Sequence, residues 1–485
     1  MQSILPVLAI LGGILMMFAV TMLVPLGFAF FGHDAGLPAY DEAILITFSC
    51  GLLLFLACRR FKRELQPRDG FLLVSLVWTV LPAFGALPLM VHISGLSFTD
   101  AYFEAVSGLT TTGSTVLTGL DALPTSINVW RCFMVLIGGM GILVLAVAIL
   151  PLLGVGGSQL FKAETPGPMK DQKLTPRIAE TARGLWVVYF AIALACLLSY
   201  RVAGMGWADA FMHMCSTMGL GGFSSYDASF AQFNSPAIEA VAIVFMLIAG
   251  VNFALYFVAW RRRSLWGVSR DVEARLFIGT LAAAVLSIAV FLTAHRVYPT
   301  FGEALRHAAF NVVSIATTTG FSSVDYAQWP IFAPVLMLFL CCFATCAGST
   351  GGGIKMIRAM LLLKGARREL RRIVHPRAVV PVTLGSAVVD AQVLSSVLAF
   401  MLFYGAVMVA ATMLLLFSGL DVVTAFTAVI ASINNTGPGL GQVGPSTTYQ
   451  GLSDFQTWVC SITMLLGRLE LFSILVLFTA SFWRK

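Results

Sequence analysis

Long apolar runs separated by short polar stretches recur along the whole of this 485-residue chain. The clearest are Ile4–Phe31, Phe71–Val91, Ile331–Thr345 and Val459–Ser481. A helix needs roughly 20 predominantly apolar residues to cross a bilayer. The strands of a membrane barrel alternate polar and apolar positions, and these runs do not. The pattern therefore predicts an all-α polytopic membrane protein. The first run lacks a basic segment before it, so we expect a retained helix and not a cleaved signal.

Four shorter segments between the runs resemble one another when they are aligned on a glycine. They read DAYFEAVSGLTTTG, DAFMHMCSTMGLGG, HAAFNVVSIATTTG and TAFTAVIASINNTG, and they end at Gly113, Gly222, Gly320 and Gly437. The glycines are 109, 98 and 117 residues apart. Self-similarity at a nearly constant spacing is typical of a repeated structural unit, so we expect four repeats.

Each of these segments, about 12 residues long, lies between two apolar runs and is too short to span a membrane. We expect a half-helix that enters from one side and is followed by extended backbone. Asp100 and Asp209 begin the first two segments and would cap those helices, whereas His307 and Thr424 take this place in the other two. Irregular backbone at membrane depth is tolerated only where it is buried in protein or lines a cavity. Four such loops predict a pore with fourfold pseudosymmetry.

The chemistry of these loops favours a monovalent cation. The C-terminal end of each half-helix would bring roughly −0.5 charge to the pore. A glycine with positive φ can help to turn successive carbonyls, such as those of Thr110–Ser114, toward an ion. No carboxylate stands at the glycines, whereas Ca²⁺ and Mg²⁺ prefer sites with carboxylates. The alternative is that the glycines only allow close packing of helices.

The distribution of basic residues predicts the topology. Only 11% of the residues are charged, against about 25% in soluble proteins. Of the 30 Lys and Arg residues, 23 fall into five clusters that the positive-inside rule places in the cytoplasm, together with both termini. The clusters are Arg59–Arg68, Lys162–Arg183, Arg261–Arg275, Lys364–Arg377 and Arg484–Lys485.

The acidic residues show the opposite distribution. The expected outer loops contain 13 of the 23 acids, Glu104 among them, and four basic residues, Arg131 among them. A negative outer mouth would raise the local concentration of cations. Alternatively, these acids only avoid the inner leaflet or cap helices.

A glycine-rich sequence, GSTGGG at 348–353, interrupts the second apolar segment of the third repeat. Each glycine disfavours a helix by roughly 1 kcal/mol relative to Ala, and the freed backbone must face a cavity or protein. Arg468 is the lone basic residue of the last apolar run, and Glu470 is too near in sequence to pair with it on a helix. We expect Arg468 to contact the carbonyls of this loop or to form a barrier to cations, and Lys355 to act similarly. The alternative is a snorkelling or purely structural Arg468.

The sequence offers little support for an enzyme. GVGGSQ at 154–159 has Gln159 where a dinucleotide fingerprint needs glycine, and no P-loop pattern is present. The nine cysteines make no CxxC pair and lie in or beside apolar stretches, so we expect packing roles for them. A membrane-embedded enzyme therefore lacks a catalytic constellation. A secondary transporter that couples K⁺ to H⁺ or Na⁺ stays open as the alternative to a channel, although such proteins typically have inverted repeats and charged residues at the midplane.

Several longer runs, together with the four glycine segments, resemble the Trk/Ktr/HKT superfamily of K⁺ transporters, and most closely its Trk potassium-uptake membrane subunits. The runs are LVWTVLPAFGALPLM near 76–90, GGMGILVLAVAILPLLG at 138–154, TPRIAETA at 175–182, GSTGGGIKMIR at 348–358, ELRRIVHPRAV at 369–379, NNTGPGLG at 434–441 and LGRLELF at 466–472. The resemblance covers essentially the whole chain. It implies four M1–loop–M2 repeats and two extra N-terminal helices, for which Ile4–Phe31 and Ala43–Cys58 are the candidates.

The resemblance also implies domain boundaries and site residues. The expected units are an N-terminal helix pair at 1–69 and repeats at 70–183, 184–274, 275–390 and 391–485. The expected K⁺ filter residues are Thr111, Thr112, Gly113, Gly221, Gly222, Thr319, Gly320, Thr436 and Gly437. The expected gate is an intramembrane loop at 345–354 below the filter, made by Gly348, Ser349, Thr350, Gly351, Gly352 and Gly353, with Lys355 and Arg468.

The function implied by the resemblance is K⁺ uptake across the bacterial inner membrane. K⁺ would be the transported ion, and no bound organic cofactor is expected in this chain. The implied partners are a second copy of the chain in a homodimer, a cytoplasmic TrkA-like nucleotide-binding ring that docks on the basic loops, and the lipid bilayer, but no nucleic acid. Gly221 stands where the other repeats have threonine, so the ring is unequal and ion preference cannot be deduced from it.

Overall fold

The computed structural model describes residues 4–61, 66–148, 174–264, 266–385 and 387–484. Much of the basic cluster Lys162–Arg183, part of Arg59–Arg68, Lys485 and the GVGGSQ sequence at 154–159 lie outside these ranges. The described chain is mostly helical, and the only strands within it, β1 (Thr383–Leu384) and β2 (Ala387–Val388), pair as a short antiparallel hairpin. The predicted all-α class is confirmed.

Two antiparallel helices precede the repeats, as predicted. The first is interrupted at Met22, which separates α1 (Leu5–Thr21) from α2 (Leu23–Gly32), and the second is α3 (Leu37–Cys58). A Cβ on Gly12 would lie only 2.7 Å from the carbonyl oxygen of Gly51, so these two glycines permit the close contact of α1 and α3.

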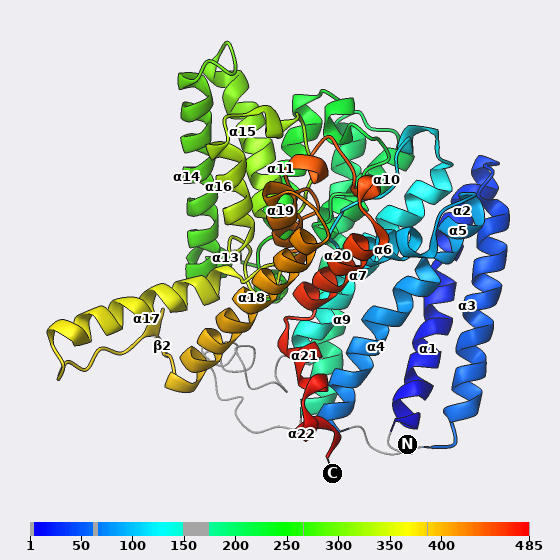
Figure 1. The fold of residues 1–485 in the computed structure, drawn as a ribbon, viewed down its shortest axis with the longest axis horizontal. Coiled ribbons are helices and arrows are strands. Elements are labelled where there is room, and N and C mark those ends of the chain that lie inside the picture. The colour runs from blue at the N-terminus through cyan, green and yellow to red at the C-terminus, as the bar shows by residue number, and fades with distance from the viewer. Residues whose placement is uncertain (1–3, 62–65, 149–173, 265, 386, 485) are drawn as a thin grey trace.

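The rest of the chain repeats one arrangement four times: a long helix, a short helix, extended backbone and a further helix (Figure 1). The first set is α4 (Pro67–Gly85), α5 (Leu87–His92), α6 (Phe98–Leu109) and α7 (Thr125–Ala148). The second is α9 (Leu174–Val202), α10 (Trp207–Gly219), α11 (Pro236–Ala249) and α12 (Phe253–Arg262). A short connecting helix, α13 (Trp266–Arg270), follows, and the third set is α14 (Val272–Ala294), α15 (Phe301–Ala316), α16 (Phe332–Cys341) and α17 (Met356–Val374). The fourth is α18 (Ala391–Phe417), α19 (Val422–Ile433), α20 (Asp454–Arg468), α21 (Phe472–Leu475) and α22 (Ala480–Trp483).

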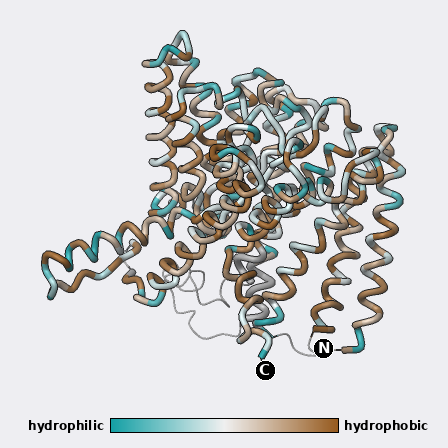
Figure 2. Tube along the Cα trace, in the orientation of Figure 1, coloured by the Kyte–Doolittle hydropathy of each residue, from teal (hydrophilic) through white to brown (hydrophobic). Residues whose placement is uncertain are grey.

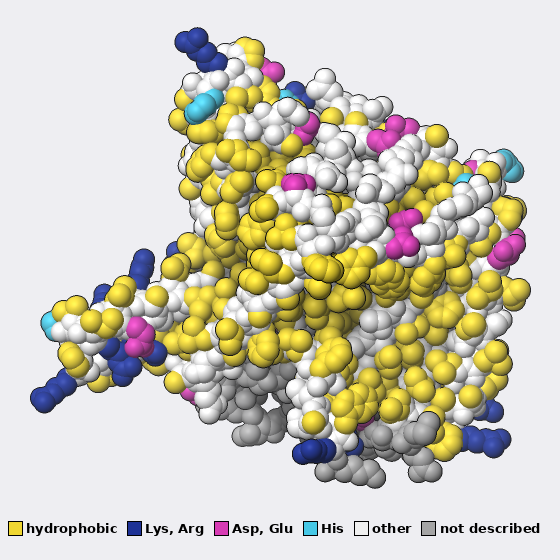
Figure 3. All heavy atoms as spheres, in the orientation of Figure 1, with side chains coloured by type: hydrophobic (Ala, Val, Ile, Leu, Met, Phe, Trp, Pro, Cys, Tyr) yellow, Lys and Arg dark blue, Asp and Glu magenta, His cyan; other side chains and the backbone are white. Residues whose placement is uncertain are grey.

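Seven helices within the described ranges are long and apolar enough to cross a membrane, and nine if each bent pair counts as one span. Apolar residues follow the long helices, while polar residues gather at their ends and in the loops at the top of the view (Figure 2). Helix α1 begins and α22 ends at the same end of the molecule (Figure 1). Many of the visible Lys and Arg side chains lie at this lower end and on the projecting helix α17, whereas most acidic side chains in view lie toward the top (Figure 3).

Three of the second helices in the repeats are broken, and two predicted spans are therefore wrong as single helices. The chain bends by 88° between α11 and α12, and by 103° after α20, so Val459–Ser481 is not one span. Within Ile331–Thr345, helix α16 ends at Cys341, and helix resumes only at Met356. The break in the third repeat includes the predicted interruption at 348–353. At the break between α11 and α12, the carbonyl of Gly250 and the N–H of Phe253 bond instead to Cys346 and Gly348.

The predicted helix caps are also corrected. Ser97, not Asp100, caps α6 by accepting a hydrogen bond from the Asp100 backbone N–H at 3.1 Å. Helix α10 begins after Gly206, and the Asp209 carboxylate instead accepts from the Ser225 and Tyr226 hydroxyls. In the last two repeats the caps are Thr300 and Asp421, so neither His307 nor Thr424 occupies a cap position. The glycine alignment fixed where the short helices end but not where they begin.

Candidate functional site

The four loops that follow the short helices leave them by the same hydrogen bond. In each repeat, the backbone N–H of the residue before the aligned glycine donates to the carbonyl five residues earlier. The four bonds are Thr112 to Ser107 (2.8 Å), Gly221 to Ser216 (3.0 Å), Thr319 to Ser314 (2.8 Å) and Thr436 to Ala431 (2.9 Å). Bonds of this kind satisfy carbonyls that a helix end leaves free, and here they turn the chain sharply into the loop.

The backbone beyond this bond has an unusual conformation that is common to the four repeats. Two residues before each glycine stands a residue in the left-handed region, which non-glycine residues adopt uncommonly. These residues are Thr111 (φ 55°), Leu220 (φ 55°), Thr318 (φ 61°) and Asn435 (φ 54°). The glycines themselves have positive φ in three repeats, with Gly222 the exception. Leu220, Thr318 and Asn435 were not among the predicted site residues, because no feature of their side chains signals a strained backbone.

The four glycines pack against one another's loops in a closed cycle. A Cβ on Gly113 would overlap the backbone nitrogen of Gly222, and a Cβ on Gly222 would lie 2.6 Å from the carbonyl carbon of Gly320. A Cβ on Gly320 would overlap the carbonyl oxygen of Thr436, and a Cβ on Gly437 would lie 2.8 Å from the carbonyl oxygen of Thr112. Each repeat therefore touches the next in chain order, and the fourth touches the first. Side chains at these positions would separate the loops.

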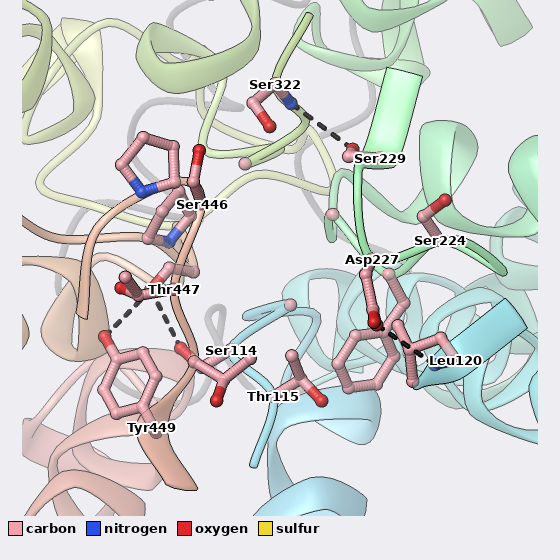
Figure 4. Close-up of a pocket in the computed structure, with 18 of the residues that line it drawn as sticks. Ser114, Thr115, Leu120, Ser224, Asp227, Ser229, Ser322, Ser446, Thr447 and Tyr449 are labelled. Atoms are coloured by element: carbon pink, nitrogen blue, oxygen red, sulfur yellow. Dashed lines mark hydrogen bonds between the residues drawn. The ribbon is translucent and has the colours of Figure 1, made fainter. Parts of the chain in front are cut away.

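A cavity of about 270 Å³ opens above the four glycines and is lined by all of them. Figure 4 shows that hydroxyl-bearing side chains from all four repeats surround it, among them Ser114, Ser224, Ser322 and Thr447. The carboxylate of Asp227 also lines this cavity, but it accepts the N–H groups of Gly119 and Leu120 at 2.8 and 3.0 Å. The floor of the cavity thus presents backbone and hydroxyl groups.

The ring is chemically unequal. Repeats 1 and 3 each contain a pair of hydrogen-bonded threonines, Thr110 with Thr112 at 2.7 Å and Thr317 with Thr319 at 2.8 Å. Repeat 2 has Gly219 and Gly221 at the corresponding places. In repeat 4, Asn435 donates through Nδ2 to the Thr112 hydroxyl at 3.0 Å.

One predicted filter carbonyl is already occupied by protein donors. The carbonyl oxygen of Gly437 accepts hydrogen bonds from the hydroxyls of Ser114 and Tyr449, both at 2.9 Å (Figure 4). The Gly437 backbone is therefore held from two sides, by its own repeat and by repeat 1.

The predicted gate residues lie directly against the C-terminal ends of the short helices. The Thr350 hydroxyl donates to the carbonyl of Met218 at 3.0 Å, and the N–H of Gly352 donates to the hydroxyl of Thr318 at 2.9 Å. A Cβ on Gly352 would overlap the carbonyl oxygen of Asn434. The loop thus contacts the ends of α10, α15 and α19, on the side of the loops away from the cavity.

Buried charged residues hold this loop in place. The Glu273 carboxylate accepts the N–H groups of Ala347 and Ile357, at 2.8 and 3.1 Å, on either side of the glycines. Lys355 donates from its ammonium to the carbonyl of Gly351. Glu273 was not predicted as a site residue, although an acid at the start of an apolar run is a signal that could have found it.

Arg468 is 2% exposed and reaches the same loop. Its guanidinium donates to the carbonyl of Thr350 at 2.9 Å and to that of Gly138 in α7 at 3.3 Å. Glu470, as expected, is not its partner, because Glu470 pairs with Arg358 at 2.5 Å. The predicted contact between Arg468 and the carbonyls of the glycine-rich loop is therefore present.

Comparison with known proteins identifies the family. The family model TrkH, described as a cation transport protein, matches residues 37–485. The chain belongs to the TrkH family. The resemblance deduced from the motifs is confirmed, and membership in a family of transport proteins agrees with the prediction that the chain is not an enzyme.

Relatives within the family align along the full chain. A Trk system potassium uptake protein TrkH from Halomonas elongata is 46% identical over 485 residues and covers 100% of both chains. The protein of the same name from Escherichia coli K12 is 44% identical over 477 residues, and the match covers 98% of both chains. The fold is likewise similar to the crystal structure of the potassium transporter TrkH from Vibrio parahaemolyticus, with a TM-score of 0.92, 42% identity, and coverage of 100% of this chain and 99% of that one.

Two charged residues that were predicted in the outer loops lie elsewhere in this TrkH-family fold. Glu104 on α6 and Arg131 on α7 are both fully buried, and their side chains form an ion pair at 2.7 Å. Counting them with the exposed outer charges was wrong. Their spacing of 27 residues gives no local signal of pairing, because the contact depends on how α7 packs behind α6.

Proposed function

We propose that this chain takes up K⁺ across the bacterial inner membrane by conducting it through the ring of four glycine loops. The observation that carries the proposal is the closed cycle in which Gly113, Gly222, Gly320 and Gly437 each abut the next loop. A single conduit needs four segments that meet on one axis. Glycines that served only for helix packing would have no reason to contact one another in chain order.

The chemistry of the ring supports a large monovalent cation. The ends of four short helices point their negative dipole ends toward the ring, and threonine hydroxyls add neutral oxygens. The glycine positions themselves carry no carboxylate, whereas a divalent cation prefers carboxylates. The relatives named as potassium uptake proteins support K⁺ as the transported ion.

We propose that the loop at 345–354 is the gate, and that the positive charges of Lys355 and Arg468 oppose the passage of cations through it. It packs against the short helices on the side away from the cavity, where an ion that has passed the ring must go. A cation there would meet the guanidinium of Arg468 and the ammonium of Lys355. Motion of the loop together with these charges would open the path.

The remaining parts of the proposal concern orientation and partners. The cavity above the glycines would face outward, and the basic clusters and both termini would face the cytoplasm. A TrkA-like nucleotide-binding ring would dock on the basic loops, and a second copy of the chain would complete a homodimer. The division into a helix pair at 1–69 and repeats at 70–183, 184–274, 275–390 and 391–485 belongs to the same proposal.

Recording from the purified full-length chain in planar bilayers tests the proposal. With K⁺ gradients, we expect a reversal potential that follows the K⁺ equilibrium potential. A reversal potential that moved with an imposed proton or Na⁺ gradient would favour coupled transport instead. The absence of any K⁺ current or flux, with and without the nucleotide-binding partner, would contradict the proposal.

A further inference from the structure

The position nine residues before each ring glycine carries a different side chain in each repeat: Glu104, His213, Asn311 and Ala428. The three polar side chains have the same structural role. Each reaches from its short helix to the segment that leaves the glycine, and so supports that segment from behind. The contacts are Glu104 with Thr115 and Val116, His213 with Ser224, and Asn311 with Ser323. Ala428 offers no polar atom, and in repeat 4 the hydroxyl of the neighbouring Thr427 bonds instead with the N–H and the carbonyl of Leu440, at 2.9 and 3.2 Å.

The support in repeat 1 is the most extensive. One oxygen of the Glu104 carboxylate lies 2.9 Å from the Thr115 hydroxyl, and the other accepts the N–H of Val116 at 3.0 Å. The guanidinium of Arg131 completes the site, with bonds to Glu104 at 2.7 and 2.8 Å and to the Thr115 hydroxyl at 3.2 Å. Two side chains thereby hold the backbone just beyond Gly113.

Arg131 extends the same network to repeat 2. It donates to the carbonyl of Ser224 at 3.2 Å and to the side-chain oxygen of Asn128 at 3.1 Å. Its guanidinium also lies over the ring of Phe223, 4.4 Å from the centroid. Phe223 and Ser224 directly follow Gly222, so one buried cation bonds to the outgoing segments of two neighbouring repeats.

The energetics argue against a role in stability alone. Removing two charges from water is expensive, and apolar residues of similar volume often stabilise a fold as well as a buried ion pair does. Here both side chains are fully buried, and their hydrogen bonds end on the segments that leave the ring. Discrimination between ions depends on the geometry and stiffness of the coordinating oxygens.

We propose that Glu104 and Arg131 are positioning residues that hold the ring segments of repeats 1 and 2 in the geometry that prefers K⁺ to Na⁺. This inference rests on the proposed conduction through the glycine ring. The two residues act through Thr115, Val116 and Ser224, whose backbone they fix.

A second ion pair in the same protein provides a matched control. Arg306 and Glu239 also join a short helix to a neighbouring helix, with a bond of 2.7 Å. Arg306 is 28% exposed, and its other side-chain bond is to Asn234, outside the ring segments. Removing this pair should lower the thermal stability without altering ion preference.

The test compares relative permeabilities of K⁺, Rb⁺ and Na⁺ from bi-ionic reversal potentials. The first variant is Thr115→Val, which keeps the ion pair but removes the bonds of the Thr115 hydroxyl to Glu104 and Arg131. The others are the double variant Glu104→Gln with Arg131→Met, and the control Glu239→Gln with Arg306→Met. We expect the K⁺-to-Na⁺ permeability ratio to fall toward one in Thr115→Val and in the double variant. A tenfold fall in this ratio corresponds to about 1.4 kcal/mol. The control should keep the wild-type ratio.

Each outcome decides the matter. If Thr115→Val or the double variant conducts with the wild-type ratio, the inference is wrong while the proposed conduction stands. If the double variant does not fold, the result with Thr115→Val decides alone. A wild-type chain that conducts K⁺ and Na⁺ equally would also overturn the inference, because no selective geometry would then exist to be held. A wild-type chain that conducts neither would instead contradict the proposed function.

Discussion

The guanidinium of Arg468 donates a hydrogen bond of 2.9 Å to the backbone carbonyl of Thr350, across 118 residues of sequence. The same side chain reaches the carbonyl of Gly138. One buried cation thus joins α20 of repeat 4 to the glycine-rich loop of repeat 3 and to α7 of repeat 1. The position of the loop is therefore determined by three repeats together.

Replacing this cation should open the path below the ring. We expect Arg468→Ala to raise K⁺ flux into proteoliposomes by the order of tenfold, because a barrier lower by about 1.4 kcal/mol has that effect on a rate. The K⁺-to-Na⁺ permeability ratio should stay unchanged, since the ring itself is not altered. Arg468→Lys is the control, because it keeps the positive charge and should keep flux low if the barrier is electrostatic. A loss of folded protein with unaltered flux per molecule would instead indicate a structural role.

Shortening the glycine-rich loop should also raise flux. Removing Gly351 and Gly352 takes away the bond from Gly352 to Thr318 and the contact with Asn434, so the loop can no longer lie against the ends of α15 and α19. We expect higher K⁺ flux in proteoliposomes, measured per folded molecule. Unchanged flux in a variant that elutes and unfolds like the wild type would count against a gating role.

The ring glycines should not tolerate even one methyl group. In Gly320→Ala the new Cβ would overlap the carbonyl oxygen of Thr436, and the residue would have to keep φ near 91°. We expect loss of most K⁺ flux, or of K⁺ preference, as neighbouring loops separate. Gly302→Ala is the matched control in the same repeat, because a Cβ there meets nothing within 4 Å. Equal flux in both variants would mean that the ring does not conduct.

The cap of the fourth short helix should make stability depend on pH. Hydrogen bonds from the side chain and the backbone N–H of Thr424 hold the pKa of the Asp421 carboxylate below its ordinary value. A lowered pKa in the folded state stabilises the fold at pH values above the ordinary pKa of about 4, and this contribution is lost as the pH falls through the lowered pKa.

Thermal unfolding of detergent-solubilised protein can measure this effect. At neutral pH, Asp421→Ala should destabilise the fold by about 1 kcal/mol, as the loss of a helix cap typically does. The difference from the wild type should shrink below about pH 4. Ser453→Ala removes the neutral cap of α20, and its effect should not change with pH. A pH-independent difference for Asp421→Ala would show that the carboxylate contributes no more than a neutral cap.

The fold could be predicted from the sequence to the extent that it depends on local patterns. Apolar runs revealed most of the long helices, and the aligned glycines located the ends of the four short helices, because both are properties of nearby residues. The starts of those helices were wrong, since Ser97 and Thr300 lie upstream of the aligned segments. The break after α20 was missed, although Gly467, Arg468 and Glu470 stand beside it and are unfavourable within a continuous span.

The candidate site divides in the same way. GSTGGG and the isolated Arg468 stand out in the sequence because both are unfavourable within a membrane helix. The support of the loops by Glu104 and Arg131 does not stand out. Both residues looked like ordinary outer-loop charges, and only the packing of α7 behind α6 brings them together.

The sequence alone determined that the chain is a helical membrane protein with four repeats, each ending a short helix at a glycine. Composition and spacing are enough for this, because hydrophobic length and glycine positions act locally. Only the tertiary structure decided that the four loops close in chain order, that Glu273 holds the glycine-rich loop and Arg468 joins this loop to α7, and that Glu104 pairs with Arg131. These contacts join residues from 27 to more than 300 positions apart, and hydrogen bonds at such separations depend on how whole helices pack.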